Sequence, residues 1–199
     1  MNKLLLILIL TLSFQSWTKA DDIKDFEIEG MSIGDSLLDY INLKTINNEK
    51  FFNYDSEEMY SLYLYKNLEL YDELEINFQN DDNEYRIVAI SGVTILNIKD
   101  CLKKKKIVVK SLKLDFATKP ENYTHIYDNN YIEGSSNLST SLNSESKAYI
   151  TQWTFASGDK VRVWCSEWGN DVKKLLKWNN ELHVKIQEKK WMDFIQRQN

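Results

Sequence analysis

The chain has 199 residues, with 25 lysines and arginines against 30 aspartates and glutamates, and a formal net charge of −5. Only three of the basic residues are arginines. This argues against nucleic acid as a partner, because phosphate binding needs a positive field and base reading usually needs arginine. The length suits one domain of ordinary size.

The first twenty residues have the layout of a secretory signal peptide. Lys3 is followed by an apolar run over residues 4–14, and Ala20 closes the segment with a small side chain. The run is too short to span a bilayer comfortably. We expect cleavage after Ala20, which would leave residues 21–199 as a single exported domain with no stable membrane anchor.

Residues 32–41 predict an amphipathic helix. Ser32 is placed as its N-cap, and Asp35 three residues later completes a capping pattern and opposes the helix dipole. The side chains collected on one face would be Ile33, Leu37, Leu38 and Ile41. The alternative, an anion site at the helix N-terminus, is disfavoured because Asp35 would repel the anion.

Alternating apolar and polar residues then predict strands over residues 60–65 and 71–79, and β-branched Ile87, Val88 and Ile90 predict a returning strand over 85–93. In the second strand, apolar Leu74, Ile76 and Phe78 alternate with polar Glu73, Glu75 and Asn77. We expect the polar face of this strand to meet water. The polar turn at residues 80–83 makes these strands an antiparallel meander.

A second helix is predicted over about residues 98–112, with Asn97 as its cap and Asp100 three residues on. Its buried stripe would consist of Ile98, Cys101, Leu102, Val108, Val109 and Leu112. The lysine run 103–106 is interpreted as a solvated face with Lys105 at its margin. The alternative is a patch for an anionic lipid or another polyanion.

The second half predicts a further meander. Its elements are a weakly indicated strand at 123–127, a flexible Ser-rich loop at 134–146, a hairpin of 147–155 and 160–166, a strand at 181–186 and a terminal helix at 189–198. The fold class is therefore α+β: an antiparallel sheet of about six strands in two meanders, two main amphipathic helices packed on it, and a short C-terminal helix.

Cys101 and Cys165 are the only cysteines. Export favours oxidation, both are expected on core-facing sides, and one pairing is available within a monomer. We predict a disulfide between them. The alternative is two buried thiols.

The candidate binding face lies on the predicted hairpin. Pairing its arms about the turn at 157–159 places Tyr149 and Trp153 on one face with Arg162 and Trp164, and Trp168 follows nearby. Aromatic rings beside a cation suit a sugar, a peptide or a partner protein. The alternative is that a helix covers this face and makes it core.

No catalytic, cofactor or metal site is predicted. His125 and His183 have no second His or Cys at ligand spacing, and the acidic pairs do not fit a calcium loop. Walker A, G-x-G-x-x-G and G-x-S-x-G runs are missing from the sequence. Glu73 and Glu75 share a strand face, so a carboxylate pair for glycoside hydrolysis stays open, although such alternation is typical of the outer surface of a sheet.

The run GMSIGDSLLDYI resembles the opening of uncharacterised exported proteins of Pelagibacter-type marine bacteria. In these, EGMSIGDSLLDY precedes a sheet and a helix whose Cys-Leu-Lys-Lys resembles residues 101–104. More distantly, a G-M-S turn ahead of antiparallel strands is similar to the SmpA/OmlA envelope lipoproteins, which have a β-lactamase-inhibitor-protein-like fold. The first resemblance implies no residue roles, and the second implies protein–protein contact. This chain lacks the lipobox cysteine of the second family.

The preferred function is an exported, non-enzymatic domain that binds an envelope protein or a small ligand through the aromatic face. The alternative is a periplasmic hydrolase that uses acidic residues. The sequence indicates no cofactor for either function.

Overall fold

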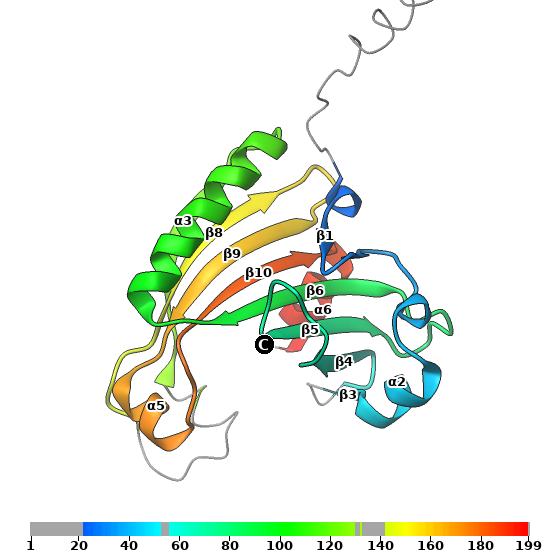
Figure 1. The fold of residues 1–199 in the computed structure, drawn as a ribbon, viewed down its shortest axis with the longest axis horizontal. Coiled ribbons are helices and arrows are strands. Elements are labelled where there is room, and N and C mark those ends of the chain that lie inside the picture. The colour runs from blue at the N-terminus through cyan, green and yellow to red at the C-terminus, as the bar shows by residue number, and fades with distance from the viewer. Residues whose placement is uncertain (1–21, 53–55, 130–131, 133–141, 199) are drawn as a thin grey trace, which may run out of the picture.

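The computed structural model describes residues 22–52, 56–129, 132 and 142–198. Within them the chain forms an α+β fold with an eight-stranded antiparallel sheet, a small two-stranded sheet, and helices on both sides of the large sheet (Figure 1). The predicted class is confirmed at this level. The predicted number of about six strands is too low.

The large sheet joins two antiparallel meanders. In spatial order its strands are β3 (Phe51–Phe52), β4 (Met59–Leu64), β5 (Glu73–Gln79), β6 (Ile87–Ile95), β10 (Glu181–Gln187), β9 (Lys160–Glu167), β8 (Lys147–Thr154) and β7 (Glu121–Ile126). The meanders meet where β6 pairs with β10. The two strands beyond the predicted six are the edges: β3 is two residues long, and β7 is exposed at every position, so neither carries a clear burial alternation.

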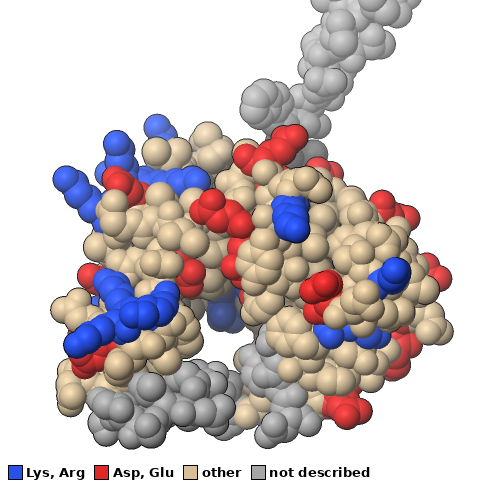
Figure 2. Space-filling model, turned by 60° about the horizontal axis from the view of Figure 1, so that its bottom comes forward, with Lys and Arg blue, Asp and Glu red and all other residues tan. Residues whose placement is uncertain are grey.

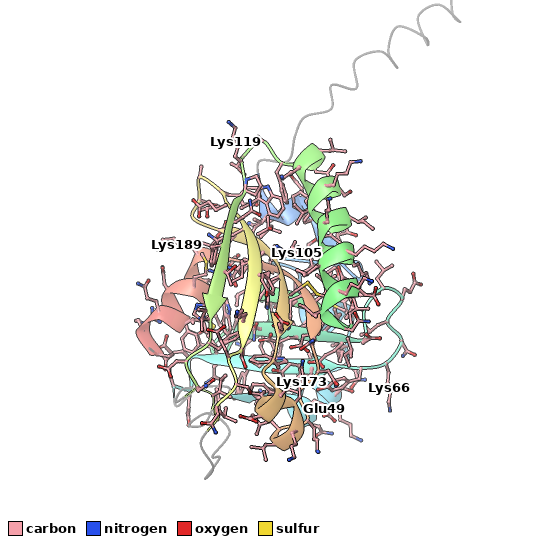
Figure 3. All side chains as sticks on the ribbon, turned by 90° about the vertical axis from the view of Figure 1, so that its left-hand side faces the viewer. Glu49, Lys66, Lys105, Lys119, Lys173 and Lys189 are labelled. Atoms are coloured by element: carbon pink, nitrogen blue, oxygen red, sulfur yellow. A yellow bond between two sulfur atoms is a disulfide. The ribbon has the colours of Figure 1, made fainter. Side chains whose placement is uncertain are left out.

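Two helices cover opposite faces of the sheet. α3 (Ile98–Asp115) packs on β9 and β10, and α6 (Lys189–Gln198) packs on the other side beside β6 (Figures 1 and 3). We call these sides the α3 face and the α6 face. Shorter elements are η2 (Ile23–Asp25), β1 (Glu27–Ile28), β2 (Met31–Ser32), η3 (Leu37–Asp39), α2 (Leu43–Glu49) and α5 (Asn170–Leu175).

The main hydrophobic core lies between the α3 face and α3. One row across the sheet, set by the strand register, is Leu62, Ile76, Ile90, Ile186, Val161 and Trp153. All six are at most 2% exposed, and each such side chain contributes roughly 1.5–3 kcal/mol by burial. A smaller cluster on the α6 face packs Trp191 and Phe194 of α6 against Val88 and Ala89 of β6.

The helix predicted over residues 32–41 does not form. Ser32 ends β2, Gly34 has a φ of +92°, and only the short η3 follows. A residue with positive φ cannot continue a right-handed helix, so the run is broken inside the predicted first turn. The expected capping bond is present in part, since the Ser32 N–H donates to Asp35 Oδ2 over 2.9 Å, but it closes a turn.

Glu29, which lies between β1 and β2, anchors a distant loop. The Glu29 carboxylate accepts backbone N–H bonds from Glu69, Leu70 and Tyr71 at 2.7–3.2 Å. Burial opposes ionisation of Glu29, but these three donors outweigh it and lower its pKa. Glu29 thereby fixes the position of Tyr71 over the sheet.

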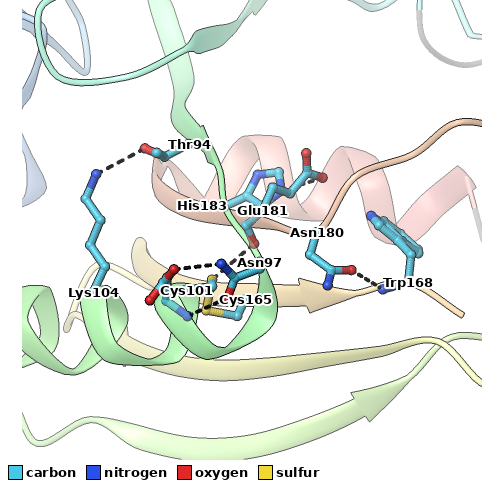
Figure 4. Close-up of a disulfide and its surroundings, with 10 residues drawn as sticks. Thr94, Asn97, Cys101, Lys104, Cys165, Trp168, Asn180, Glu181 and His183 are labelled. Carbon is cyan, nitrogen blue, oxygen red and sulfur yellow. Dashed lines mark hydrogen bonds and ion pairs between the residues drawn. A yellow bond between two sulfur atoms is a disulfide. The ribbon is translucent and has the colours of Figure 1, made fainter. Parts of the chain in front are cut away.

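The second predicted helix is confirmed as α3, which runs on to Asp115. The Asp100 N–H donates to Asn97 Oδ1 over 3.0 Å, and Asn97 Nδ2 donates to Asp100 Oδ2 over 2.6 Å (Figure 4). Leu102, expected in the buried stripe, is 40% exposed, so that part of the prediction is wrong. Lys105 is half-buried, and burial lowers its pKa.

The predicted disulfide is also confirmed. Cys101 of α3 and Cys165 of β9 are bonded with their Cα atoms 5.9 Å apart, and both are fully buried (Figure 4). The bond ties the start of α3 to the centre of the second meander.

The predicted signal peptide lies outside the described residues, as does most of the Ser-rich loop. The described end of that loop, residues 142–146, packs on α5: the Asn143 N–H donates to Asp171 Oδ2, and Ser144 Oγ accepts from the Asp171 N–H. This end is therefore held by specific bonds. Among the described helices, none combines the length and apolarity that crossing a membrane requires.

Candidate functional site

The α6 face carries polar and aromatic side chains, and one isoleucine, from three neighbouring strands. They are Ile150 and Gln152 of β8, Arg162 and Trp164 of β9, and His183 and Lys185 of β10. The register aligns Gln152, Arg162 and Lys185 in one row across the sheet. Because α6 packs over the other end of β6 and β10, Arg162 and Trp164 stay partly exposed.

The predicted aromatic face is divided between the two sides of the sheet. Trp153 lies opposite Val161 and Tyr149 opposite Cys165, so both belong to the α3 face, whereas Arg162 and Trp164 belong to the α6 face. The predicted pairing of the hairpin was shifted by one residue. Such a shift reverses the face of every side chain in one arm relative to the other.

The loop of the hairpin explains the shift. Thr154 pairs with Lys160, and the Phe155 N–H donates to the Asp159 carbonyl, so five residues separate the paired strands. The sequence indicated a turn at Ser157-Gly158-Asp159 but not the pairing outside it.

The remaining predicted residues serve the fold. Trp153 is fully buried and contacts Phe116 edge-to-face at 5.2 Å, so the helix-covered alternative is correct for this residue. The Tyr149 hydroxyl donates to Glu167 over 2.7 Å on the α3 face. Trp168 follows β9, where its ring stacks on Tyr127 at 4.7 Å. The structure therefore brings together only Arg162 and Trp164 of the predicted five.

Arg162 and Trp164 line a cleft of about 360 Å³ on the α6 face. Its other walls are Tyr123, His125, Tyr127 and Ile150. The first three come from β7 and the residue after it, and the sequence did not associate them with the site. A volume of this size is at the lower end of small-molecule sites.

A buried amide holds the arginine in place. Arg162 Nε donates to Gln152 Oε1 over 2.7 Å, and the Tyr123 hydroxyl lies 3.4 Å from the same oxygen. Gln152 is 5% exposed, and its Nε2 donates to Thr154 Oγ1. The guanidinium is therefore fixed by one edge, and within the described ranges neither Nη group has a hydrogen-bond acceptor.

Trp164, which forms another wall of the cleft, is supported by His183. The Trp164 and His183 rings stack at 4.3 Å with an interplanar angle of 4°, and His183 Nε2 lies 2.9 Å from Glu181 Oε1 (Figure 4 shows the His183–Glu181 pair). This covers one face of the Trp164 indole. His183 is thus a strand-face histidine that is half-buried against a tryptophan.

The polar face of β5 does not simply meet water, contrary to the prediction. Asn77 is fully buried, and Glu75 pairs with Lys185 of β10 at 3.5 Å. Burial opposes ionisation of Glu75, but Lys185 and Asn77 outweigh it and lower its pKa. Glu73 lacks such a partner, and burial with two neighbouring carboxylates raises its pKa. The two carboxylates therefore have opposite electrostatic roles.

A larger hollow of about 530 Å³ lies at one end of the sheet, lined by residues 95–97, 173 and 177–180. Basic side chains gather over this region around α5 (Figure 2). Lys177 and Trp178 are exposed there, so the hollow is an open groove. It has no counterpart of the buried Gln152 that fixes Arg162.

Within the described part of the chain, no group of three or more His, Cys, Asp or Glu side chains is arranged to hold a metal ion. Comparisons with protein-family models, with curated proteins and with solved structures gave no match. The chemistry of the cleft therefore has to follow from its own residues.

Proposed function

We propose that this protein is an exported, non-enzymatic domain that binds a small anionic ligand in the cleft around Arg162 and Trp164. The observation that carries the proposal is the kind of partner that Arg162 has. Arg86 and Arg197 each pair with a carboxylate, whereas Arg162 bonds to the neutral amide of Gln152 and has no ion pair among the described residues. A fixed, partly buried cation without a counter-charge is a binding site for an anion.

The geometry favours a carboxylate. With Nε occupied by Gln152, the two Nη groups are the remaining donors of Arg162, and they can donate two parallel bonds to one carboxylate. Lys160, two residues before Arg162 on the same strand face, is a second basic group near it: burial and then Arg162 lower the pKa of Lys160, and Glu121 opposes them. The rings of Tyr123, Tyr127 and Trp164 offer flat apolar contact to the rest of the ligand.

The alternative hydrolase receives no comparable support. The cleft contains no Asp or Glu among its described lining residues. Glu75 is held by Lys185, and Glu181 by His183, so these carboxylates are engaged with the protein itself. Export is supported by the disulfide, because such bonds persist in oxidising compartments.

The test is calorimetric titration of the purified protein with benzoate, indole-3-acetate and glucuronate, and with benzamide as the uncharged counterpart of benzoate. We expect at least one carboxylate to bind, and benzoate to bind more tightly than benzamide. Arg162→Gln should weaken the binding roughly tenfold to a hundredfold, the value of a charged hydrogen-bond pair. Arg197→Gln, which removes an arginine of a surface ion pair, is the matched control and should leave binding unchanged.

Two results would contradict the proposal. One is the failure of all three carboxylates to bind. The other is binding that Arg162→Gln and Arg197→Gln reduce equally, since this would trace the effect to net charge.

A further inference from the structure

A second cleft lies on the α3 face, independent of the anion site. It is about 320 Å³ and runs between α3, the N-terminal strand β1 and the sheet. Its floor is Val161, Val184 and Ile186, and one wall is Ile107, Val108 and Leu112 of α3. The described lining is almost entirely apolar, with Ser111 and Glu27 as the polar exceptions.

One end of this cleft is closed by aromatic rings. Phe26 lines it and contacts Phe116, just beyond the C-terminus of α3, with ring centroids 4.5 Å apart. Tyr71 forms the side opposite α3, lying so close over Gly92 that a methyl group there would come within 2.6 Å of the ring. An elongated apolar group in the cleft would therefore have these rings at one end.

The other end is basic. Positions 112, 108 and 104 follow one another at a spacing of four along the same side of α3, so Lys104 comes one turn beyond the apolar wall. Lys104 reaches from α3 to Thr94 of β6, where Nζ lies 3.5 Å from Oγ1 (Figure 4). Lys104 has no ion pair among the described residues, and Lys103 and Lys110 on the same helix add positive charge.

We propose that this cleft binds the hydrocarbon chain of an anionic amphiphile such as a fatty acid, with its carboxylate at Lys104. The closed aromatic end takes the end of the chain, and the basic end takes the charge. Glu27 favours this orientation, because it follows Phe26 in the sequence and also lines the cleft, and its negative charge would repel an anionic head at this end. The volume, at the lower limit for ligand sites, suits one chain.

The test is direct binding of laurate to the purified protein, with 1-dodecanol as the uncharged chain and dodecyltrimethylammonium as the cationic one. Laurate should bind with one molecule per chain, and more tightly than dodecanol by up to about fivefold, which is the range of an exposed ion pair. Dodecyltrimethylammonium should bind most weakly.

Two pairs of variants locate the ligand. Ser111→Trp fills the cleft from an exposed position and should reduce laurate binding at least about tenfold, whereas Lys113→Trp, elsewhere on α3, should not. Lys104→Gln should abolish the preference for laurate over dodecanol, whereas Lys106→Gln should preserve it. Thermal unfolding and circular dichroism verify that all four variants are folded.

The proposal is overturned if laurate does not bind, if Ser111→Trp leaves its affinity unchanged, or if the Lys104 and Lys106 variants behave alike. It is also overturned if sedimentation shows that the cleft is occupied by a second copy, seen as a dimer that Ser111→Trp dissociates. Arg162→Gln should not change laurate binding, so the two sites succeed or fail separately.

Discussion

The contact between Gly92 and Tyr71 gives a quantitative test of the sheet register. Gly92 pairs with Leu74 and Val184, which places it on the α3 face beneath the Tyr71 ring. A Cβ atom at position 92 would lie 2.6–2.7 Å from three ring carbons, about 1 Å inside normal contact. The ring cannot withdraw easily, because the Tyr71 N–H is held by Glu29. Gly92→Ala should therefore reduce the free energy of unfolding by about 2 kcal/mol, within the usual range for overpacking.

The effect of Gly92→Ala on the free energy of unfolding should change sign once the Tyr71 ring is removed. In a Tyr71→Ala background the added methyl meets no ring, and alanine is preferred to glycine in a strand by roughly 0.5–1 kcal/mol. The wild type, the two single variants and the double variant form a double-mutant cycle. Their free energies of unfolding would be measured by urea unfolding followed by circular dichroism, and compared provided that the m-value is the same in all four proteins. Equal losses from Gly92→Ala in both backgrounds would refute the proposed packing of Tyr71 on Gly92.

Three further predictions concern the core and the buried carboxylates. Cys101→Ala/Cys165→Ala should lower the free energy of unfolding by about 4 kcal/mol, from a loop closed over 64 residues, and a loss under 1 kcal/mol would contradict it. Trp153→Ala should lower the free energy of unfolding, measured with urea, by roughly 3–5 kcal/mol, because the indole is fully buried. A loss as small as that of an exposed side chain would argue against the position of Trp153 under α3. At pH 7, Glu73→Gln should stabilise the protein and Glu75→Gln should destabilise it. Burial raises the pKa of Glu73, so ionisation of this carboxyl opposes folding. Lys185 outweighs the effect of burial and lowers the pKa of Glu75, so ionisation of that carboxyl favours folding. The Glu73 difference should fade as the pH falls from the raised pKa of Glu73 to about 4.3, the value of an unfolded glutamate, whereas the Glu75 difference should fade only below about 4.3, as the pH falls through the lowered pKa of Glu75. Equal signs of the two differences in unfolding curves at pH 7 would refute the assignment.

The sequence located the regular elements well where a local signal was strong. The strands β4, β5 and β10 follow period-two alternation, whereas β6 was indicated by β-branched residues and the hairpin of β8 and β9 by its turn. α3 follows an asparagine cap with a helical apolar stripe. The edge strands β3 and β7 were missed or weakly indicated because exposed positions carry no alternation. The N-terminal helix failed because Gly34 adopts a positive φ, which a capping pattern does not reveal.

The candidate site was predicted only in part for a different reason. The sequence picked out Arg162 and Trp164, but the face each side chain occupies depends on the parity of the hairpin pairing. A five-residue connection over 155–159 and a four-residue connection over 156–159 differ in parity, and both are compatible with Ser157-Gly158-Asp159. The contributions of Tyr123, His125 and Tyr127 required knowing that β7 lies beside β8.

The sequence by itself determined that the chain forms two meanders around a disulfide-linked helix, because periodicity, capping and the single available cysteine pair are local or countable properties. Only the tertiary structure decided which side chains face each other across the sheet, how Gln152 fixes Arg162, and that Phe26 and Lys104 mark the two ends of an apolar cleft. These relations join residues far apart in the chain, and the hydrogen-bond register and helix packing that create them leave no local pattern.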